Sequence, residues 1–431
     1  MRVRMMTPVP FEEGPNKPRV GVSAHAETGR CRGTPSSHHS LARFIRGPAI
    51  LDRGNTRPIR MSLVALISGI ALAACTTSAP PDDGPVAVPA PAPEVAQPAA
   101  PRSSTYASLA PGMIFPADRS LHRPEDGVLL ADGRLLVSDQ VHGLVLLAED
   151  GTSRPFGNLA AAGYQHAPPE IVGGANGLTL EPGGTHALLT DVYRGGIYRI
   201  DIAAGSSALV YQHTYGVNMA RGDRAGGLWF SQSARNSPAK GEEELWGSIA
   251  TGAAEGAVWY LAPGATAGAA KLVVDGLVFA NGLALDEAGG YLYLAETVGG
   301  RVLRYSMDVG AGTLSEPAVL LEGVVPDNLE LDASGRLWIA LPLRSEIITL
   351  DLASGVQTSM FRVTTDETEA TLAAIGSRMS DGAPWLDLMT PALWSPAPGA
   401  VTGMVLSADG TLRYVTSLGD ALIRIESAGE D

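Results

Sequence analysis

The sequence predicts an all-β fold, a six-bladed β-propeller, and two observations lead to this prediction. The first is composition, because 51 glycines, 6% aromatic residues and 18% charged residues in 431 positions are typical of a turn-rich β protein. The second is an internal repeat, in which one strand–turn–strand pattern occurs six times. Repeats of short antiparallel strands form blades around a central channel, so six copies predict six blades.

Each copy begins with an oxygen-bearing side chain, continues in alternating apolar residues and reaches a glycine eight residues later, as in NGLALDEAGGYLYLAE (281–296). Period-two alternation predicts a strand, and the glycine marks the turn to the next strand. The first residues of the copies are Glu125, Asn176, Asn218, Asn281, Asp327 and Thr402, and the glycines are Gly133, Gly184, Gly226, Gly289, Gly335 and Gly410. Residues 108–116 are expected to supply a strand that closes the ring.

The residues before the propeller predict export from the cytoplasm. Arg57 and Arg60 precede an apolar run that ends in Leu-Ala-Ala-Cys at 72–75, which describes a secretory signal too short for a good membrane span. Small residues directly before a cysteine resemble the lipobox of bacterial lipoproteins. Cys75 is then the lipidated residue that anchors the protein to the membrane of the bacterial cell envelope, in the outer membrane or on the periplasmic side. The alternative is a chance alanine-rich stretch with a free cysteine.

Four segments follow from these patterns. They are an unstructured or mis-called extension (1–60), a lipoprotein signal peptide (61–75), a Pro/Ala-rich linker (76–104) and the propeller (105–431). The two cysteines, Cys31 and Cys75, offer no disulfide framework. A net charge of −14 argues against a nucleic-acid partner and is compatible with cation binding.

The first residues of the six copies predict a cation site in the channel. In an up-and-down blade the first residue begins the innermost strand, so all six are expected to meet at one mouth of the channel. A hard cation such as Ca²⁺ takes roughly six to eight oxygen ligands, and the sequence has no Cys or His cluster typical of zinc. For any one of them, the alternative is an ordinary turn former before a strand.

Three stretches carry a family resemblance: PDNLELDASGRLWIAL (326–341), FANGLALDEAGGYLYLAETVGGRVLRY (279–305) and PEDGVLLADGRLLVSD (124–139). They resemble the strictosidine-synthase-like proteins and the related gluconolactonase, senescence-marker and luciferin-regenerating group, and more distantly the paraoxonases. The resemblance covers about 106–431 and implies one divalent cation, usually calcium, in the channel. By resemblance its ligands are Glu125, Asn218, Asn281 and Asp327, and Asp126 corresponds to a ligand of the second calcium of paraoxonase-like members.

Two departures from the family pattern affect the expected chemistry. Met219 stands where the third-blade motif usually has an acidic residue, and Ala400 stands where the plant synthases have the glutamate that serves condensation. Hydrolysis is therefore the more natural reaction. No Gly-x-Ser-x-Gly elbow is present, which disfavours an acyl-enzyme.

Two long insertions are expected on the cation side of the propeller, at 233–256 and 364–400. In the second, Asp366 followed by Glu369 predicts a capping box that opens a short helix to about Arg378. Trp385 is expected to line a lid over the metal, together with Leu388, Met389 and Trp394. The alternative is that these side chains only bury the insertion on the propeller.

These observations predict a monomeric, calcium-dependent hydrolase of a small-molecule lactone or ester. Asp327, His166 or His213 would take the proton from water, and Asn176, Asn328 and Trp385 would contact the substrate. The alternative is a non-catalytic lipoprotein whose propeller binds a ligand or partner and whose cation is structural.

Overall fold

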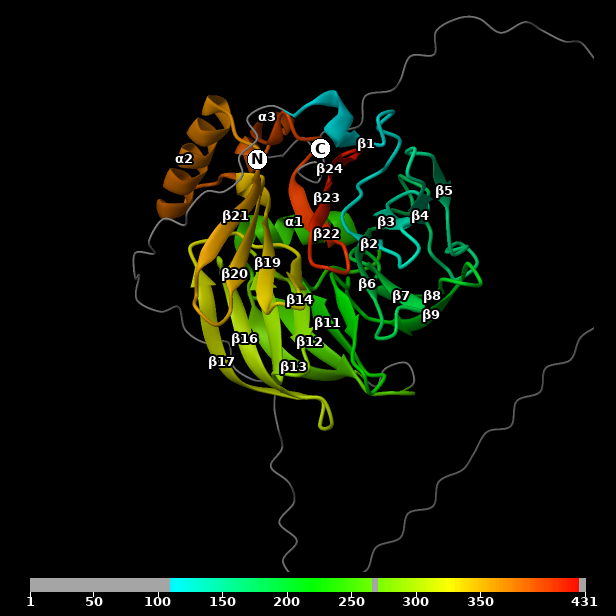
Figure 1. Cartoon of the computed structure of the whole chain (residues 1–431). Helices are drawn as coiled ribbons and strands as arrows, with labels where there is room; N and C mark the ends of the chain where they lie inside the picture. Colours follow the sequence, from blue (N-terminus) through cyan, green and yellow to red (C-terminus); the bar gives the residue numbers. More distant parts are fainter. Residues whose placement is uncertain (1–108, 266–269, 426–431) are drawn as a thin grey trace, which may run out of the picture. The chain divides into compact units, whose positions relative to one another are not determined.

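The structure is a computed structural model that describes residues 109–265 and 270–425. The segments expected at 1–60, 61–75 and 76–104 lie outside these residues. The described strands form six four-stranded antiparallel sheets, which Figure 1 shows as the blades of a propeller. The predicted all-β, six-bladed fold is confirmed.

The first three blades use consecutive strands. Blade one consists of β2 (Gly127–Leu129), β3 (Leu135–Asp139), β4 (Gly143–Leu147) and β5 (Ser153–Pro155). Blade two consists of β6 (Ala175–Leu180), β7 (His186–Asp191), β8 (Gly196–Asp201) and β9 (Ser206–Gln212). Blade three consists of β10 (Ala220–Gly222), β11 (Leu228–Gln232), β12 (Gly256–Leu261) and β13 (Lys271–Leu277).

Blades four and five follow the same order. Blade four consists of β14 (Ala280–Asp286), β15 (Tyr291–Glu296), β16 (Arg301–Asp308) and β17 (Thr313–Glu322). Blade five consists of β18 (Leu329–Leu331), β19 (Arg336–Leu341), β20 (Glu346–Asp351) and β21 (Gln357–Arg362). The first strands of neighbouring blades contact one another from blade one to blade five, as expected of the innermost strands of a propeller.

Blade six closes the ring with a strand from the other end of the propeller. It consists of β22 (Val401–Leu406), β23 (Leu412–Ser417), β24 (Leu422–Arg424) and β1 (Ile114–Phe115). Strand β1 pairs with β24 through Ile114 opposite Ile423 and Phe115 opposite Leu422. The closing strand that the sequence predicted at 108–116 is therefore present, as the outermost strand of this blade.

The glycines of the repeat occupy the turns between the first and second strands. Gly133, Gly184, Gly226, Gly335 and Gly410 all have positive φ angles, which glycine adopts without the steric cost of a Cβ. Blade four differs, because Gly290 and not the predicted Gly289 takes the left-handed conformation, with φ of 73°. Two successive glycines make both positions possible, and the repeat spacing alone does not distinguish them.

Apolar side chains between neighbouring blades form the core. Met219, which replaces the acidic residue of the family pattern, is fully buried in the cluster between blades three and four, together with Trp229 and Leu283. A charged side chain at that position would be buried among apolar residues, at a large cost in free energy. The methionine is thus explained by packing.

Short helices cover one side of the propeller. They are α1 (Gly241–Thr251) in the first insertion, α2 (Asp366–Ser380), η3 (Leu386–Leu388) and α3 (Pro391–Trp394) in the second, and the 3-10 turns η1 (Pro111–Met113) and η2 (Pro342–Arg344). Figure 1 shows α2 and α3 next to each other near the end of β21. None of the helices within the described residues has the length and apolar character that crossing a membrane requires.

The N-cap residue of α2 lies one position earlier in the chain than the sequence predicted. The N-cap is Thr365, whose Oγ1 accepts a hydrogen bond of 3.1 Å from the backbone N–H of Thr368. Glu369 does not complete a capping box with Asp366, because its carboxylate accepts hydrogen bonds from Arg362 and from Thr364 Oγ1. The predicted Asp366 cap is wrong because Arg362, at the end of β21, holds Glu369 and ties α2 to blade five.

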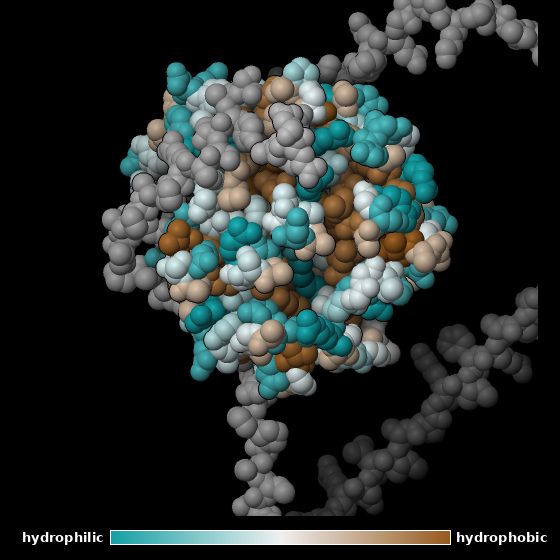
Figure 2. Space-filling model, in the orientation of Figure 1, coloured by the Kyte–Doolittle hydropathy of each residue, from teal (hydrophilic) through white to brown (hydrophobic). Residues whose placement is uncertain are grey.

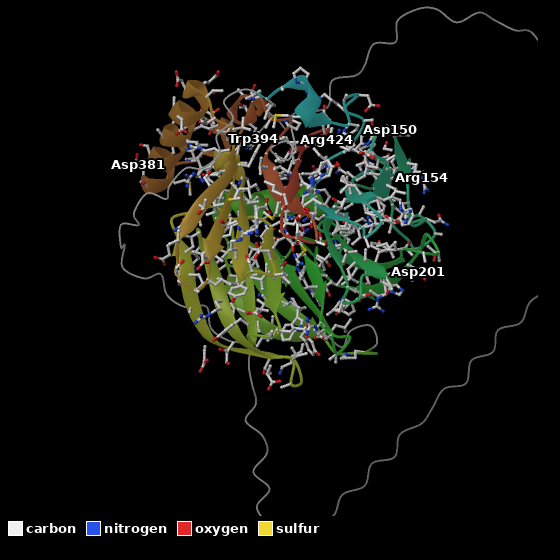
Figure 3. All side chains as sticks on the ribbon, viewed as in Figure 1. Asp150, Arg154, Asp201, Asp381, Trp394 and Arg424 are labelled. Carbon is white, nitrogen blue, oxygen red and sulfur yellow. The ribbon has the colours of Figure 1, made fainter. Side chains whose placement is uncertain are left out.

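The insertion of α2, η3 and α3 packs on the propeller through its own apolar cluster. Ile375 and Leu393 are almost fully buried against Leu343 of η2, and Trp385 packs against this cluster. The indole Nε1 of Trp394 donates to the carbonyl oxygen of Pro342 at 3.1 Å. Figure 3 shows Trp394 where α3 meets the propeller, whereas Asp381 lies at the outer end of α2. The insertion therefore buries apolar residues on the propeller, and Trp385 and Met389 also line the pocket described next, whereas Leu388 and Trp394 do not.

Candidate functional site

A pocket of about 100 Å³ opens where the innermost strands begin. The first residues of all six copies of the repeat line it, and they are Glu125, Asn176, Asn218, Asn281, Asp327 and Thr402. The predicted meeting of these six side chains at one mouth is therefore found. The pocket has a polar floor made by these residues and apolar walls made by the two insertions and by the propeller.

Glycines let the inner strands approach closely enough for these side chains to converge. A Cβ on Gly177, which follows Asn176, would lie 2.8 Å from the carbonyl oxygen of Asn218. A Cβ on Gly282, which follows Asn281, would lie 2.7 Å from the carbonyl oxygen of Asp327. Both distances are shorter than van der Waals contact allows, so the Asn-Gly pairs in the repeat serve close strand packing and not a hairpin turn.

Two buried carboxylates lie in the floor of the pocket. Glu125 is 2% exposed and Asp327 is 8% exposed. Burial, together with the negative charge of Asp327, raises the pKa of Glu125 to about 8, although Arg123 and Asn328 oppose the shift. Burial also raises the pKa of Asp327 to about 7, against a hydrogen bond from Asn281 and the charge of Arg123. A positive ion between these groups would stabilise both ionised carboxylates.

The amide side chains of the floor are oriented by neighbouring hydroxyl groups. Asn281 donates through Nδ2 to Thr297 Oγ1 at 3.0 Å, and its buried Oδ1 accepts no hydrogen bond. Asn218 donates through Nδ2 to Ser233 Oγ at 3.0 Å. Glu125 Oε2 is also buried without a hydrogen-bond partner. Unsatisfied buried oxygens are costly, and oxygen atoms are the ligands that Ca²⁺ prefers.

The oxygen set of the floor therefore fits a hard divalent cation. Within the described residues, no three His, Cys, Asp or Glu side chains group as ligands of one metal ion. The floor contributes two carboxylates and two amides, a combination that suits Ca²⁺ and does not suit zinc. These are the four residues that the resemblance implied, Glu125, Asn218, Asn281 and Asp327, and the structure brings them together.

Asn176 and Asn328, both expected to contact the substrate, make their hydrogen bonds to the protein. Asn176 Oδ1 accepts from Arg123 at 3.0 Å, and its Nδ2 donates to the backbone carbonyl and to Oδ1 of Asn218, at 3.2 and 3.3 Å. Asn328 does not line the pocket, and its Nδ2 donates to Glu125 Oε1 at 3.2 Å. The two amides thus orient Asn218 and Glu125. Trp385, the third expected contact, lines the pocket wall.

Arg123 is a pocket residue that the sequence did not reveal. It has a left-handed backbone with φ of 54°, donates to the carbonyl oxygen of Ala175 at 3.2 Å, and lies over the ring of Tyr193 at 5.4 Å. Among the described residues that line the pocket it is the one with a positive side chain. The only feature of the sequence that could have pointed to Arg123 is its place two residues before Glu125. Arginines in loops are common near such residues, so this feature does not identify a pocket residue.

His166 and His213, the two histidines considered as bases, do not line the pocket. His213 is buried, its Nε2 lies 3.0 Å from Gln232 Oε1, and its ring packs edge-on against Trp259 with centroids 4.8 Å apart. Burial lowers the pKa of His213, although Gln232 opposes the shift. His166 Nδ1 accepts from the backbone N–H of Gly173 at 3.3 Å. Both histidines lie in loops that lead from one blade to the innermost strand of the next, but outside the lining of the pocket.

Both carboxylate oxygens of Asp126, the residue matched to a second calcium, accept hydrogen bonds from backbone N–H groups. Its Oδ1 accepts from the N–H of Gly127 and its Oδ2 from the N–H of Leu178, both at 2.8 Å. Burial and the charge of Glu125 raise its pKa well above the usual value. Met219 is buried in the core, so the position where the family pattern has an acidic residue offers no carboxylate for a second ion.

Residues 211–381 match the family model described as SMP-30/Gluconolactonase/LRE-like region. This stretch is a gluconolactonase-like region. It holds blades three, four and five with α1 and α2, and therefore Asn218, Asn281 and Asp327 of the floor. The match supports a lactonase-type hydrolase at the level of the family.

Other comparisons show similarity over parts of the chain. An uncharacterized protein from Sulfolobus acidocaldarius is 29% identical over 87 residues, which are 19% of this chain and 31% of that protein, so the match spans about a third of the relative.

Three solved structures are also similar. A gluconolactonase from Xanthomonas campestris is 19% identical over 70% of this chain and 86% of its own, with a TM-score of 0.47. A luciferin-regenerating enzyme is 14% identical over 72% and 93%, with a TM-score of 0.46. The calcium-binding protein regucalcin from Agrobacterium tumefaciens is 16% identical over 59% and 79%, with a TM-score of 0.43.

Proposed function

We propose that the protein is a calcium-dependent hydrolase of a lactone or ester. The observation that carries the proposal is the pair of buried carboxylates, Glu125 and Asp327, at the floor of a pocket that also holds an unsatisfied amide oxygen of Asn281. Two like charges in a water-poor site raise each other's pKa unless a cation compensates them. The gluconolactonase-like region, matched over 211–381, agrees with a lactonase-type hydrolase.

Glu125, Asn218, Asn281 and Asp327 are the residues that would hold the divalent cation, and we propose Ca²⁺. Such an ion, when bound, polarises a carbonyl oxygen and lowers the pKa of a bound water. Ser233 and Thr297 fix the two amides through their Nδ2 atoms, so that both Oδ1 atoms are directed away from these hydroxyls. The ligand set is therefore largely preformed.

The chain itself would position the substrate and move the proton. In hydrolysis the oxygen of water binds the carbonyl carbon, the C–O bond of the lactone or ester breaks, and a proton reaches the leaving oxygen. Asp327 is the pocket carboxylate that we propose takes the proton from water and returns it to the leaving oxygen. Arg123 would stabilise negative charge that develops on the substrate, and the apolar walls would exclude bulk water.

The test is hydrolysis of a panel of lactones and aryl esters by the full-length protein, with added calcium and with excess chelator. Asp327→Asn is compared with Asp201→Asn, an equivalent change on the outer part of blade two that Figure 3 shows far from the α2–α3 insertion. We expect activity that needs calcium, survives Asp201→Asn and is lost in Asp327→Asn. Hydrolysis that is unchanged by chelator would contradict the proposal.

A second candidate is a ligand-binding propeller with a structural cation. It is favoured by one observation, the lack of any histidine among the described residues of the pocket, which leaves no base besides the proposed cation ligands. Calcium-dependent binding of a lactone without turnover would identify this function.

We also propose that the protein is tethered to the bacterial envelope through Cys75, which lies outside the described residues. The proposal is supported by the apolar run and the Leu-Ala-Ala-Cys ending at 72–75. Cys75→Ser should leave the precursor unprocessed at this position. Mass spectrometry that found an unlipidated mature N-terminus elsewhere would contradict it.

A further inference from the structure

The walls of the pocket are far more apolar than its floor. Helix α1 contributes Leu245, Trp246 and Ile249, and the second insertion contributes Met379, Trp385 and Met389. The propeller adds further apolar side chains between these and the floor, such as Phe279 and Leu343. Both insertions thus bring hydrocarbon and aromatic surface to the same cavity.

Two of these wall residues are exposed although they are large and hydrophobic. The described residues include five exposed large hydrophobic side chains, Val141, Leu209, Trp246, Val356 and Met379. Trp246 is 36% exposed and Met379 is 41% exposed, and both line the pocket. Figure 2 shows hydrophilic and hydrophobic residues mixed over the face in view, with hydrophobic patches both in its middle and at its edge. Exposed hydrophobic residues that gather at a pocket indicate an apolar ligand.

Apart from the oxygens assigned to the cation, such as Glu125 Oε2 and Asn281 Oδ1, the polar groups of the floor have few hydrogen bonds left for a ligand rich in hydroxyl groups. Asn176 has its oxygen and its nitrogen engaged by Arg123 and Asn218. Thr402 Oγ1 donates to the carbonyl oxygen of Glu125 at 2.7 Å, and Thr297 Oγ1 donates to that of Pro326 at 2.7 Å. A sugar lactone would leave several hydroxyl groups facing hydrocarbon, and burying an unpaired hydroxyl is unfavourable.

From these contacts we infer that the pocket selects a lactone or ester whose non-reacting part is a hydrocarbon, an alkyl chain or an aryl ring, and disfavours a polyhydroxylated sugar lactone. The part of this inference that gives the ligand a lactone or ester group rests on the proposed function. The floor receives the carbonyl group, and the walls from α1 and the second insertion receive the hydrocarbon. The pocket is partly open, and its volume of about 100 Å³ is below the ~150 Å³ of a cavity that holds benzene, so an aryl ring or a longer chain would extend past Trp246 and Met379.

The first experiment measures kcat/KM of the full-length protein for γ-lactones with alkyl side chains of increasing length and for glucono-δ-lactone, at saturating calcium. Each CH₂ that the walls bury should raise kcat/KM by about fourfold until the chain reaches solvent, since burying one contributes about 0.8 kcal/mol and 1.4 kcal/mol is tenfold. A flat series, or a higher kcat/KM for glucono-δ-lactone than for the alkyl lactones, would overturn the inference and leave the proposed hydrolase function standing.

The matched variants are Trp246→Ala in the wall and Leu209→Ala, an exposed hydrophobic residue of β9 that does not line the pocket. Trp246→Ala should lower the ratio of kcat/KM for the longest lactone to that for the shortest by about 15-fold, the loss expected for about two buried CH₂ equivalents. Leu209→Ala should leave this ratio at the wild-type value. Equal ratios in both variants would count against a wall that binds hydrocarbon.

The second readout is binding without turnover. The probes are 5-pentyl-2-pyrrolidinone, the lactam analogue of an alkyl lactone, and gluconolactam, each titrated against the tryptophan fluorescence of the protein. The pentyl lactam should change the emission in wild type and much less in Trp246→Ala, and gluconolactam should not change it at equal concentration. If the pentyl lactam binds but no lactone or ester is hydrolysed, the result supports a hydrocarbon-binding pocket and contradicts the proposed hydrolase function. Binding of gluconolactam alone would overturn the inference directly.

Discussion

Glu125 and Asn328 are joined by a hydrogen bond of 3.2 Å, although 203 residues separate them in the chain. Glu125 precedes the first strand of blade one and Asn328 precedes that of blade five, so the bond joins two blades that blade six separates in the ring. Asn328 fixes Oε1 of Glu125, and Oε2 is left without a partner. The carboxylate is thus held in one orientation with one oxygen available for a ligand.

Calcium should stabilise the fold, and Glu125→Gln should remove most of this effect. A ligand at a thousand times its dissociation constant stabilises the native state by about 4 kcal/mol, which raises Tm by several degrees in a propeller of this size. Thermal melts of the full-length protein with chelator and with added calcium measure the shift. Glu149→Gln, on the exposed turn after β4, is the control and should retain it. A wild-type Tm that does not respond to calcium would contradict the proposed cation site.

The fold and the floor of the pocket could be predicted from the repeat. Period-two alternation determines which side chains of a strand face the core, and equivalent positions of the repeat become equivalent positions in the blades. An oxygen at the first position of each copy also predicted which side chains meet. The sequence could not reveal Arg123, since its role depends on a left-handed backbone and on the distant groups Ala175 and Asn176. It also could not separate His213 from the pocket, because burial against Trp259 is a tertiary contact.

Asp327→Asn should reduce activity much more than Asn176→Ala, although both side chains line the floor. Removing a general base costs on the order of 100-fold or more in rate, and the asparagine would also weaken the cation. Asn176→Ala leaves Arg123 and Asn218 without one partner each, at a cost of about 1–3 kcal/mol. The measurement is kcat/KM at saturating calcium. Wild-type activity in Asp327→Asn would rule out its role as the base.

His213→Phe should change stability in acid and leave activity within about twofold, because His213 packs in blade three away from the pocket. Burial lowers the pKa of His213. Its neutral form therefore contributes stability that is fully present above the unfolded-state value of about 6.5 and is lost as the pH falls through the lowered pKa. Urea unfolding at pH 7.5 and 5 should show a smaller acid loss in this variant than in wild type.

The control for His213→Phe is His186→Phe, since His186 is a partly exposed histidine on β7. Because His186 does not line the pocket, this variant should keep the wild-type kcat/KM. A large fall in kcat/KM for His213→Phe with unchanged stability would instead restore the histidine as a catalytic base.

Arg123→Gln should bind calcium more tightly than wild type and yet hydrolyse its substrate more slowly. The guanidinium carries the one positive charge among the described residues that line the pocket, and like charges repel a cation bound nearby. Removing a unit charge near the site changes the binding free energy on the order of 1 kcal/mol, which is about fivefold in Kd. The activity should fall because the variant no longer stabilises negative charge on the substrate.

Calcium titration by calorimetry and kcat/KM at saturating calcium measure the two effects separately. The control is Arg154→Gln on β5, which Figure 3 shows at the outer edge of blade one. Weaker calcium binding in Arg123→Gln would mean that the hydrogen bonds of Arg123 to Ala175 and Asn176 organise the ligands more than its charge repels the ion.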